Sequence, residues 1–263
     1  MNIIVCIKQV PDTTDVKINP QTNTLERDGV RTIVNPFDLF AIEEALRLKA
    51  AHGGKVTIIT MGPPQAKCAL EEAIAMGADD ARLISDRAFA GSDTLATSYI
   101  LSKTVSSIGS YDLILCGKQA VDGDTAQVGP EMAVHLGIPQ VMFVRRIASV
   151  DAKDLVVERM TEHGYDRVKA PFPCLISVVK DINTPRPPSF QGRMRAKRME
   201  IPVLSPADIG CEEERIGLDG SPTWVERIFA PHARSGCTAA EGTTENIRDV
   251  AEKIEAKLEH IWE

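Results

Sequence analysis

Long apolar runs and paired cysteines are missing from this sequence, and aromatic residues are scarce at 5%. No stretch approaches the roughly 20 apolar residues that span a bilayer, and residues 1–5 lack the basic start of a signal peptide. The six cysteines form no C-x-x-C pair, and no histidine stands at zinc-finger spacing, so a metal or disulfide framework is disfavoured. We therefore expect a cytoplasmic protein with no membrane insertion and no metal site.

Basic residues are also fewer than acidic residues. The 263 residues include 30 Lys+Arg and 37 Asp+Glu, which gives a net charge of −7. Because phosphate backbones are bound by a net basic surface, we expect no nucleic-acid partner. With 43% apolar and 25% charged residues, the composition is that of a globular protein with one core and an appendage.

Familiar catalytic and phosphate-binding patterns are absent as well. Neither G-x-G-x-x-G nor G-x-x-x-x-G-K-[ST] occurs, and no nucleophile elbow or Ser-His-Asp pattern is visible. The five histidines are scattered, mostly in polar surroundings that are typical of surface positions. We predict no catalytic residue in the chain itself, so any chemistry comes from a bound cofactor.

Regular alternation of strands and helices is the main positive signal. Strands are predicted at residues 3–10, 55–61, 81–84 and 112–116, and helices at 36–52, 67–76, 94–108 and 126–136. Strands at 141–150, 155–160, 167–168 and 174–179 are more antiparallel in character. This order predicts an α/β fold with a doubly wound, mainly parallel, Rossmann-like sheet.

The composition changes at Asn183, where a Pro-rich run begins. We expect an α/β core at residues 1–183, which the family resemblance described below implies to be nucleotide-binding. Residues 184–263 are expected to hold a linker, a basic segment, an irregular stretch through Gly236 and a C-terminal helix with Thr244 as its cap. That helix carries an apolar stripe, formed by Ile247, Val250, Ala251, Ile254, Leu258 and Ile261. The stripe needs a surface, either on this core or on a partner.

Ligands of open parallel sheets bind beyond the carboxyl ends of the strands, where helix N-termini attract phosphates. Residues 117–129 follow such a strand, and they combine glycines with Thr125 and Gln127 at a helix start. The same composition also suits an ordinary turn, and Asp122 and Asp124 are more typical of turns than of metal ligands. Cys6 and Cys116 end apolar strands, which favours packed thiols that line a pocket.

Several spaced motifs together carry a family resemblance. They are CIKQVPD at residues 6–12, NPFD at 35–38, EEA at 43–45, AMGAD at 75–79, GKQA at 117–120, and PR at 185–186 before RAKR at 195–198. From residue 1 to about residue 208 the chain resembles the β subunit of electron-transfer flavoprotein. The resemblance implies an adenine nucleotide α-hydrolase-like core, a heterodimer with a homologous α subunit, and a C-terminal extension that packs on that subunit.

The family's nucleotide pocket, together with the 91–98 segment and the strand end at residue 116, gives the predicted cofactor-binding residues. They are Cys6, Asn35, Pro36, Phe37, Asp38, Met61, Ser92, Asp93, Thr94, Thr97, Cys116, Gly117, Lys118, Gln119, Ala120, Val121, Asp122, Gly123, Asp124, Thr125, Ala126, Gln127 and Val128.

Two subclasses of the family differ in the β-subunit ligand. The conventional form holds structural AMP and shuttles single electrons between dehydrogenases and a quinone reductase. The bifurcating form holds a second FAD that accepts hydride from NADH; it passes electrons to ferredoxin or flavodoxin and, through the α-subunit FAD, to an acyl-CoA-type or other flavin dehydrogenase. Residues 122–130 and 91–98 resemble the bifurcating form, and Ser92, Asp93, Thr94 and Thr97 supply donors for the longer ligand.

The basic segment resembles the family's dehydrogenase-docking loop, although the usual Tyr after Pro-Arg is missing. We predict docking by Phe190, Arg193, Met194 and Arg195, with a solvated linker as the alternative. A stand-alone ATP-binding stress-type module, which would share the sheet, is the rival from another class; its Gly-rich phosphate signature is absent.

Overall fold

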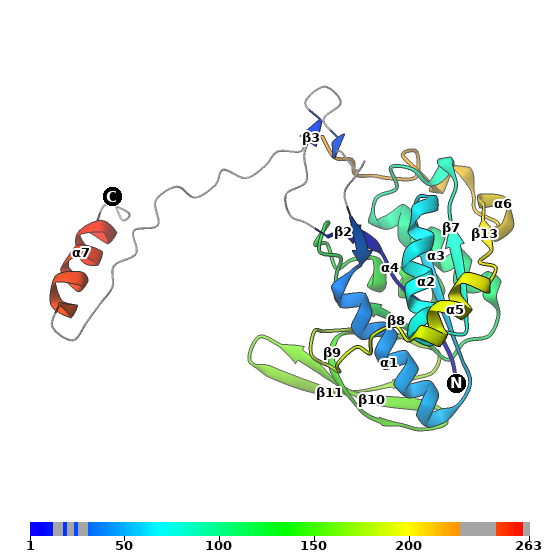
Figure 1. The fold of residues 1–263 in the computed structure, drawn as a ribbon, viewed down its shortest axis with the longest axis horizontal. Coiled ribbons are helices and arrows are strands. Elements are labelled where there is room, and N and C mark those ends of the chain that lie inside the picture. Colours follow the sequence, from blue (N-terminus) through cyan, green and yellow to red (C-terminus); the bar gives the residue numbers. More distant parts are fainter. Residues whose placement is uncertain (13–17, 20–23, 26–30, 227–245, 260–263) are drawn as a thin grey trace. The chain divides into compact units, whose positions relative to one another are not determined.

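The computed structural model describes residues 1–12, 18–19, 24–25, 31–226 and 246–259. The chain divides into two compact units, Met1–Glu226 and Arg227–Glu263 (Figure 1).

A nine-stranded sheet forms the centre of the first unit (Figure 1). Its strand order is β11-β10-β9-β12-β8-β1-β6-β7-β13. The strands are β1 (Asn2–Cys6), β6 (Lys55–Met61), β7 (Asp80–Ile84), β8 (Leu113–Gly117), β9 (Gln140–Val150), β10 (Asp154–Thr161), β11 (Gly164–Pro171), β12 (Cys174–Val178) and β13 (Val203–Leu204). Only the β9–β10–β11 pairs are antiparallel. The doubly wound, mainly parallel sheet is therefore confirmed.

Helices cover both faces of the sheet. They are α1 (Pro36–His52), α2 (Lys67–Met76), α3 (Thr94–Ile108), α4 (Val128–Leu136), α5 (Phe190–Arg198) and α6 (Pro206–Ile209). Alternate side chains of β1 enter two separate cores: Ile3 and Val5 pack with α1 and α2, whereas Ile4 packs with α3 and α4. This alternation is what a strand buried on both faces requires.

Several helix boundaries follow from local sequence signals. The Asp93 carboxylate accepts a hydrogen bond from the Ala96 amide at 3.1 Å and caps α3. Gly77 ends α2 with a φ of 135°, a conformation that L side chains rarely adopt. The helices predicted at 67–76 and 94–108 and the strand predicted at 55–61 are confirmed.

Two predicted elements have different bounds. The strand predicted at 3–10 breaks after Cys6, and β2 (Gln9–Pro11) pairs instead with β5 (Thr32–Val34). The break occurs because the Lys8 amide donates to the Asp38 carboxylate at 2.7 Å. The helix predicted from Ala126 begins at Val128, because Ala126 has a φ of 56°, outside the helical region.

The stretch after residue 183 is more ordered than the sequence predicts. Arg186 forms an ion pair with Glu43 of α1, α5 packs on α2, and β13 extends the sheet beside β7. A Cβ at Gly192 would overlap the main chain of Ala75, so this glycine permits the close approach of α5 to α2. Within the segment after Arg198 that is predicted to be irregular, β13 and α6 are regular elements, whereas the domain boundary at 183 stays a prediction.

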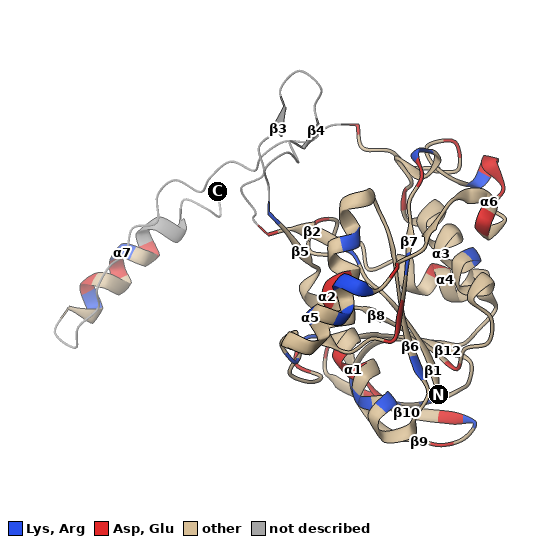
Figure 2. Cartoon of the chain, turned by 45° about the vertical axis from the view of Figure 1, so that its right-hand side comes forward, with Lys and Arg blue, Asp and Glu red and all other residues tan. Residues whose placement is uncertain are grey.

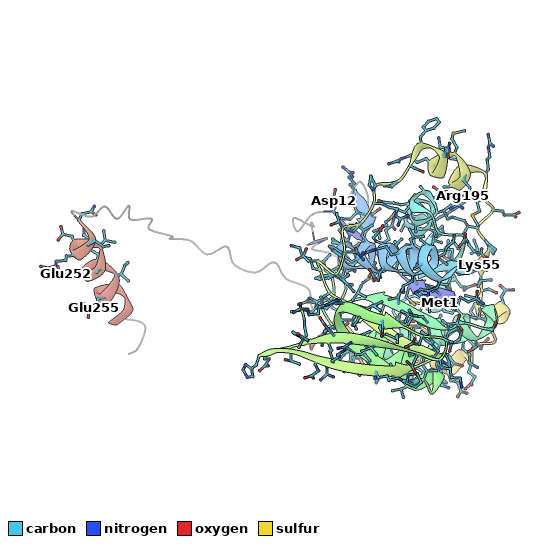
Figure 3. All side chains as sticks on the ribbon, turned by 90° about the horizontal axis from the view of Figure 1, so that it is seen from below. Met1, Asp12, Lys55, Arg195, Glu252 and Glu255 are labelled. Atoms are coloured by element: carbon cyan, nitrogen blue, oxygen red, sulfur yellow. The ribbon has the colours of Figure 1, made fainter. Side chains whose placement is uncertain are left out.

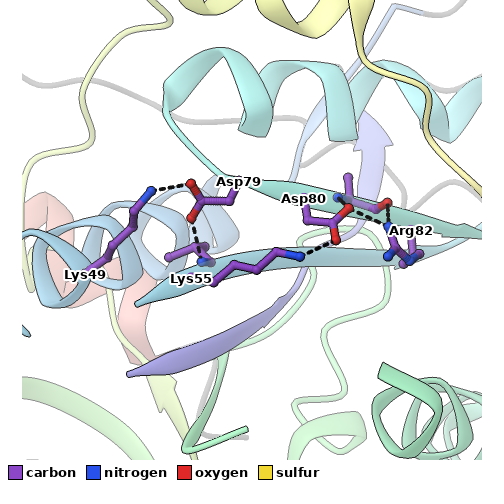
Figure 4. A network of polar contacts seen from close by, with 7 residues as sticks. Lys49, Lys55, Asp79, Asp80 and Arg82 are labelled. Atoms are coloured by element: carbon purple, nitrogen blue, oxygen red, sulfur yellow. Dashed lines mark hydrogen bonds and ion pairs between the residues drawn. The ribbon is translucent and has the colours of Figure 1, made fainter. Parts of the chain in front are cut away.

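An ion-pair network fixes the amino ends of β6 and β7 (Figure 4). Lys49 at the end of α1 reaches Asp79 at 2.5 Å, and the other oxygen of Asp79 accepts the Val56 amide at 2.8 Å. Asp80 pairs with Lys55 at 2.6 Å and with Arg82. Charged groups thus hold α1 to the sheet at the end opposite the strand-end loops.

The second unit contains α7 (Ile247–Glu259). Ile247 and Ile254 of the predicted stripe are exposed, whereas Val250 is half-buried and Ala251 is exposed. Thr244, Ile261 and the side chain of Leu258 lie outside the described residues. Among the helices that the structure describes, none has the length and hydrophobicity that crossing a membrane requires.

Candidate nucleotide-binding site

The predicted site lies where the chain reverses direction across the sheet. β1 has β6 on one side and β8 on the other, so the loops after β1 and β8 lead to opposite halves of the sheet. Such a switch point is the preferred ligand crevice of open α/β sheets. Cys6 and Cys116 are register partners at the ends of β1 and β8.

Asn35 and Asp38 join three segments at this crevice. Asn35 is 1% exposed and Asp38 is 5% exposed. The Asp38 carboxylate accepts hydrogen bonds from the Lys8 amide at 2.7 Å and from Asn35 Nδ2 at 3.0 Å. Asn35 Nδ2 also donates to the Gln119 carbonyl at 2.9 Å, and Asn35 Oδ1 accepts from the Val121 amide at 3.1 Å. The start of α1 is therefore bonded to the end of β1 and to the loop after β8.

Gly117 allows this close approach. A Cβ at this position would overlap the Asp38 carboxylate and the main chain of Phe37. Only glycine therefore fits where β8 passes the start of α1.

The loop at residues 117–127 is mostly exposed but internally braced. The Asp124 amide donates to the Ala120 carbonyl at 2.8 Å. Asp122 forms a 2.7 Å ion pair with Lys8, and Asp124 accepts from Gln119. Both carboxylates thus have a cationic or donor partner, which reduces their repulsion toward an incoming anion.

Two non-glycine residues of this loop adopt left-handed backbone conformations: φ is 54° at Asp124 and 56° at Ala126. Such conformations cost of order 1–2 kcal/mol and concentrate at ligand sites. Immediately afterwards α4 begins at Val128, and no side chain among the described residues caps it. An uncapped helix start after a strained loop is suited to an anion.

The start of α3 is arranged differently. Asp93 caps its own helix, and its second oxygen accepts from the Thr223 amide at 3.1 Å and the Thr223 hydroxyl at 2.7 Å. Ser92 Oγ accepts from the Gly217 amide at 3.0 Å, and the Asp93 amide donates to Ser221 Oγ at 2.9 Å. We call residues 217–223 the strap. The polar groups of Ser92 and Asp93, which the sequence assigns to a ligand, are thus hydrogen-bonded to the strap.

Thr94 is the residue of this helix start that reaches the loop after β8. Its hydroxyl lies 3.3 Å from Gln127 Oε1 and 3.1 Å from Glu131 Oε1. Burial raises the pKa of Glu131, and Asp93 adds to the rise, although hydrogen bonds from Thr94 and Ser98 oppose it. Thr97 is half-buried on α3, and Met61 ends β6 beside the core under α3.

The two thiols at the ends of β1 and β8 are held in the protonated form. Burial raises the pKa of Cys6 well above its ordinary value, with further contributions from Cys116 and Asp38. Burial raises the pKa of Cys116 to about 12. Since the thiolate is the nucleophile, neither group is suited to nucleophilic chemistry, in agreement with their prediction as packed thiols.

The structure thus gathers most of the predicted pocket and adds residues that sequence reasoning missed. Cys6, residues 35–38 and residues 116–128 lie together at the switch point, with Pro36 exposed and Phe37 half-buried at the start of α1. Lys8, Glu131 and the strap were not predicted. Lys8 belongs to the CIKQVPD motif at residues 6–12, so the sequence offered a reason to include it, whereas no motif marks the strap. The described residues contain no group of three or more His, Cys, Asp or Glu arranged for a metal ion.

The predicted docking residues lie on α5, where Lys and Arg gather (Figure 2). Phe190 is 80% exposed, and Met194 and Arg193 are also exposed. Arg195, which is labelled on α5 in Figure 3, differs from these residues. Its guanidinium donates to the Ile74 carbonyl at 2.8 Å and to the Ala78 carbonyl just after α2. Arg195 therefore holds α5 on the core.

Comparison with known proteins agrees with this geometry. The electron transfer flavoprotein domain model matches residues 22–209. The electron transfer flavoprotein subunit beta of Megasphaera elsdenii is 49% identical, over 98% of each chain. Protein FixA of Azorhizobium caulinodans is 48% identical, over 89% of this chain and 86% of the relative. Subunit CarD of the caffeyl-CoA reductase-Etf complex of Acetobacterium woodii is 46% identical, over 98% of each chain. Because the family model matches most of the chain and the relatives match along its length, this chain belongs to the electron transfer flavoprotein family, among its β subunits.

Proposed function

We propose that this chain is the β subunit of an electron-bifurcating electron transfer flavoprotein, working in the cytoplasm as a heterodimer with an α subunit. It holds FAD in the switch-point crevice. The FAD, when bound, supplies hydride acceptance from NADH and electron transfer to ferredoxin or flavodoxin and, through the α-subunit FAD, to a partner dehydrogenase. Similarity to a relative named as part of a caffeyl-CoA reductase-Etf complex supports an acyl-CoA-type dehydrogenase as that partner.

The uncapped start of α4 is the observation that supports a nucleotide phosphate at this site, and the resemblance of residues 122–130 and 91–98 to the bifurcating form favours FAD as that nucleotide. Val128 and Gly129 open a helix whose first amides have no capping side chain, directly after the left-handed Asp124 and Ala126. A pyrophosphate suits such a position, because amides and the helix dipole both favour negative charge. The Asp122 and Asp124 carboxylates are engaged by Lys8 and Gln119, so they oppose the phosphates less than free carboxylates would.

AMP remains the second candidate, and a specific observation favours it. The strap occupies the polar groups of Ser92 and Asp93. Of the predicted donors at the start of α3, Thr94 is the one that contacts the loop after β8. A single phosphate at α4 requires nothing from the start of α3. The conventional function, single-electron shuttling between dehydrogenases and a quinone reductase, would follow.

Counting the nucleotides separates the two candidates. The chain is co-expressed with its α subunit, the complex is purified and denatured, and released FAD and AMP are quantified per heterodimer. We expect two FAD and no AMP. One FAD with one AMP would replace bifurcation by the conventional function.

Removing the Thr94 hydroxyl provides a matched check. Thr94→Val keeps the shape of the side chain and deletes its polar contact with Gln127 and Glu131. If FAD extends from α4 to α3, this variant lowers FAD content, whereas Thr104→Val, which removes a hydroxyl bonded to its own helix at 3.0 Å, does not. Equal FAD content in both variants would argue against a ligand that reaches α3.

A further inference from the structure

We propose that Asp38 is the positioning residue of the nucleotide site: with Asn35 it fixes the loop at residues 117–121 in its ligand-binding shape. This inference rests on the proposed nucleotide site and assigns Asp38 a role that is different from ligand contact.

The Asp38 carboxylate lies at the centre of converging donors. The Lys8 amide donates to Oδ2, Asn35 Nδ2 donates to Oδ1, and the Gly117 amide also hydrogen-bonds to this carboxylate. At 5% exposure it is turned into the protein. An ionised carboxylate accepts hydrogen bonds at both oxygens, and it is the side chain that satisfies donors from every side.

Asn35 connects the Asp38 carboxylate to the loop at residues 117–121 through hydrogen bonds. Its amide nitrogen is shared between Asp38 and the Gln119 carbonyl, and its oxygen accepts from the Val121 amide. Asp38 selects the orientation of the Asn35 amide, because the NH₂ group must face the carboxylate. The flipped amide would place a donor against the Val121 N–H and an acceptor against the Gln119 carbonyl.

The protonation state of Asp38 should therefore control the loop. A neutral carboxyl group presents a donor hydrogen toward groups that are themselves donors, so at least one of these hydrogen bonds is lost. Burial raises the pKa of Asp38 to about 7, although hydrogen bonds from Asn35, Lys8 and Gly117 and the charge of Lys8 oppose the rise. Nucleotide affinity should accordingly fall as the pH drops through this range.

The other titratable groups around Asp38 do not produce the same change. Cys6 on β1 and Cys116 on β8 have raised pKa values, so both stay neutral at pH 6–8. Lys8, after β1, carries the ammonium that pairs with Asp122 of the loop.

Titration calorimetry on the nucleotide-depleted heterodimer tests the proposal. FAD, whose pyrophosphate stays ionised throughout, gives the profile at pH 6, 7 and 8, and AMP, whose phosphate itself titrates near pH 6, is added at pH 8 only. If binding requires ionised Asp38, wild-type affinity should be about tenfold weaker at pH 6 than at pH 8, in proportion to the ionised fraction. Asp38→Asn should bind weakly at all three pH values, with a flat profile. Glu44→Gln removes another buried carboxylate from α1, and it should keep the wild-type profile.

Asn35→Ala provides a second variant, which leaves the carboxylate in place and cuts its connection to Gln119 and Val121. It should weaken binding at pH 8 and flatten the profile, so the proposal stays testable even where Asp38→Asn fails to fold. A flat wild-type profile, or wild-type affinity in Asn35→Ala, would overturn the positioning role while nucleotide binding itself persists. Wild-type protein that binds neither nucleotide at any pH would overturn the proposed site as well.

Discussion

Arg186 holds Glu43 in a two-pronged ion pair, with Nε 2.7 Å from Oε2 and Nη2 2.9 Å from Oε1. The Arg186 amide donates to the same carboxylate at 3.1 Å. Glu43 is buried on α1, 143 residues away in the sequence. This contact fixes the direction in which the chain leaves β12 toward α5.

Replacing Arg186 by alanine should destabilise the fold by about 1–2 kcal/mol at pH 7. The loss is below the 3–5 kcal/mol of a fully buried pair because the Arg186 side chain is partly exposed. Urea unfolding measures it. Lys197→Ala, at an exposed position of α5, should stay within about 0.5 kcal/mol of wild type.

The same pair predicts a pH dependence. Burial pushes the pKa of Glu43 upward, but the hydrogen bonds and charge of Arg186 hold it below its usual value. A depressed pKa stabilises the fold above the unfolded-state pKa, about 4.3 for Glu. The difference between wild type and Arg186→Ala should therefore be full at pH 7 and shrink as the pH falls below about 4. A difference that grows in acid would contradict this assignment.

Gly117→Ala should destabilise the protein by about 1–3 kcal/mol, as other overpacked sites do. The added methyl group meets the Asp38 carboxylate and the Phe37 main chain, so nucleotide content should also decrease. Gly123→Ala is the matched control from the same loop, because no atom lies within 4 Å of its added Cβ. Thermal unfolding and nucleotide analysis of the two purified complexes should show a lower melting temperature and a lower nucleotide content for Gly117→Ala than for Gly123→Ala. Equal values in both variants would refute the steric argument.

Thr223→Val should loosen the strap. It deletes the hydroxyl that donates to Asp93 at 2.7 Å and retains the backbone donor at 3.1 Å. We expect a loss of about 1 kcal/mol and faster amide exchange in residues 216–226, measured by hydrogen–deuterium exchange mass spectrometry. Thr223→Ser, which keeps the hydroxyl, should exchange like wild type.

Phe190→Ala should weaken docking of the partner dehydrogenase without changing stability. Phe190 is exposed among basic residues of α5, an arrangement suited to an apolar anchor with electrostatic steering. Electron delivery should show a raised KM for the dehydrogenase. Val134→Ala, at an exposed apolar position on α4, should leave that KM unchanged; an equal effect of both variants would remove the docking role from α5.

Local signals explain which elements the sequence predicts well. Asp93 and Gly77 mark helix ends through side-chain capping and a positive φ, so residues 67–76 and 94–108 are predicted at the residue level. The antiparallel character predicted for the later strands is confirmed for the β9–β10 and β10–β11 pairs, although β11 is longer than the two predicted residues. It is wrong for residues 174–179, because β12 pairs parallel with both β8 and β9.

The features that the sequence does not predict depend on contacts between residues that are distant in the chain. The strand break at Lys8 requires Asp38, and the strap requires Ser92 and Asp93, more than 100 residues earlier. Gly192 suggests a flexible linker in the sequence, yet it serves close packing of α5 on Ala75. The predicted cofactor-binding residues come together because the carboxyl ends of parallel strands meet at one edge of the sheet, whereas the role of Asp38 depends on which donors surround it.

Both edge strands of the nine-stranded sheet are poorly suited to pairing with another chain. One edge, β13, has only two residues, and the other, β11, carries Asp166, Arg167 and Lys169 along an exposed strand. Short or charged edges resist pairing with a strand from another chain. Polymerisation through this sheet is therefore disfavoured, and a partner is directed to side-chain surfaces instead of joining the sheet as a tenth strand.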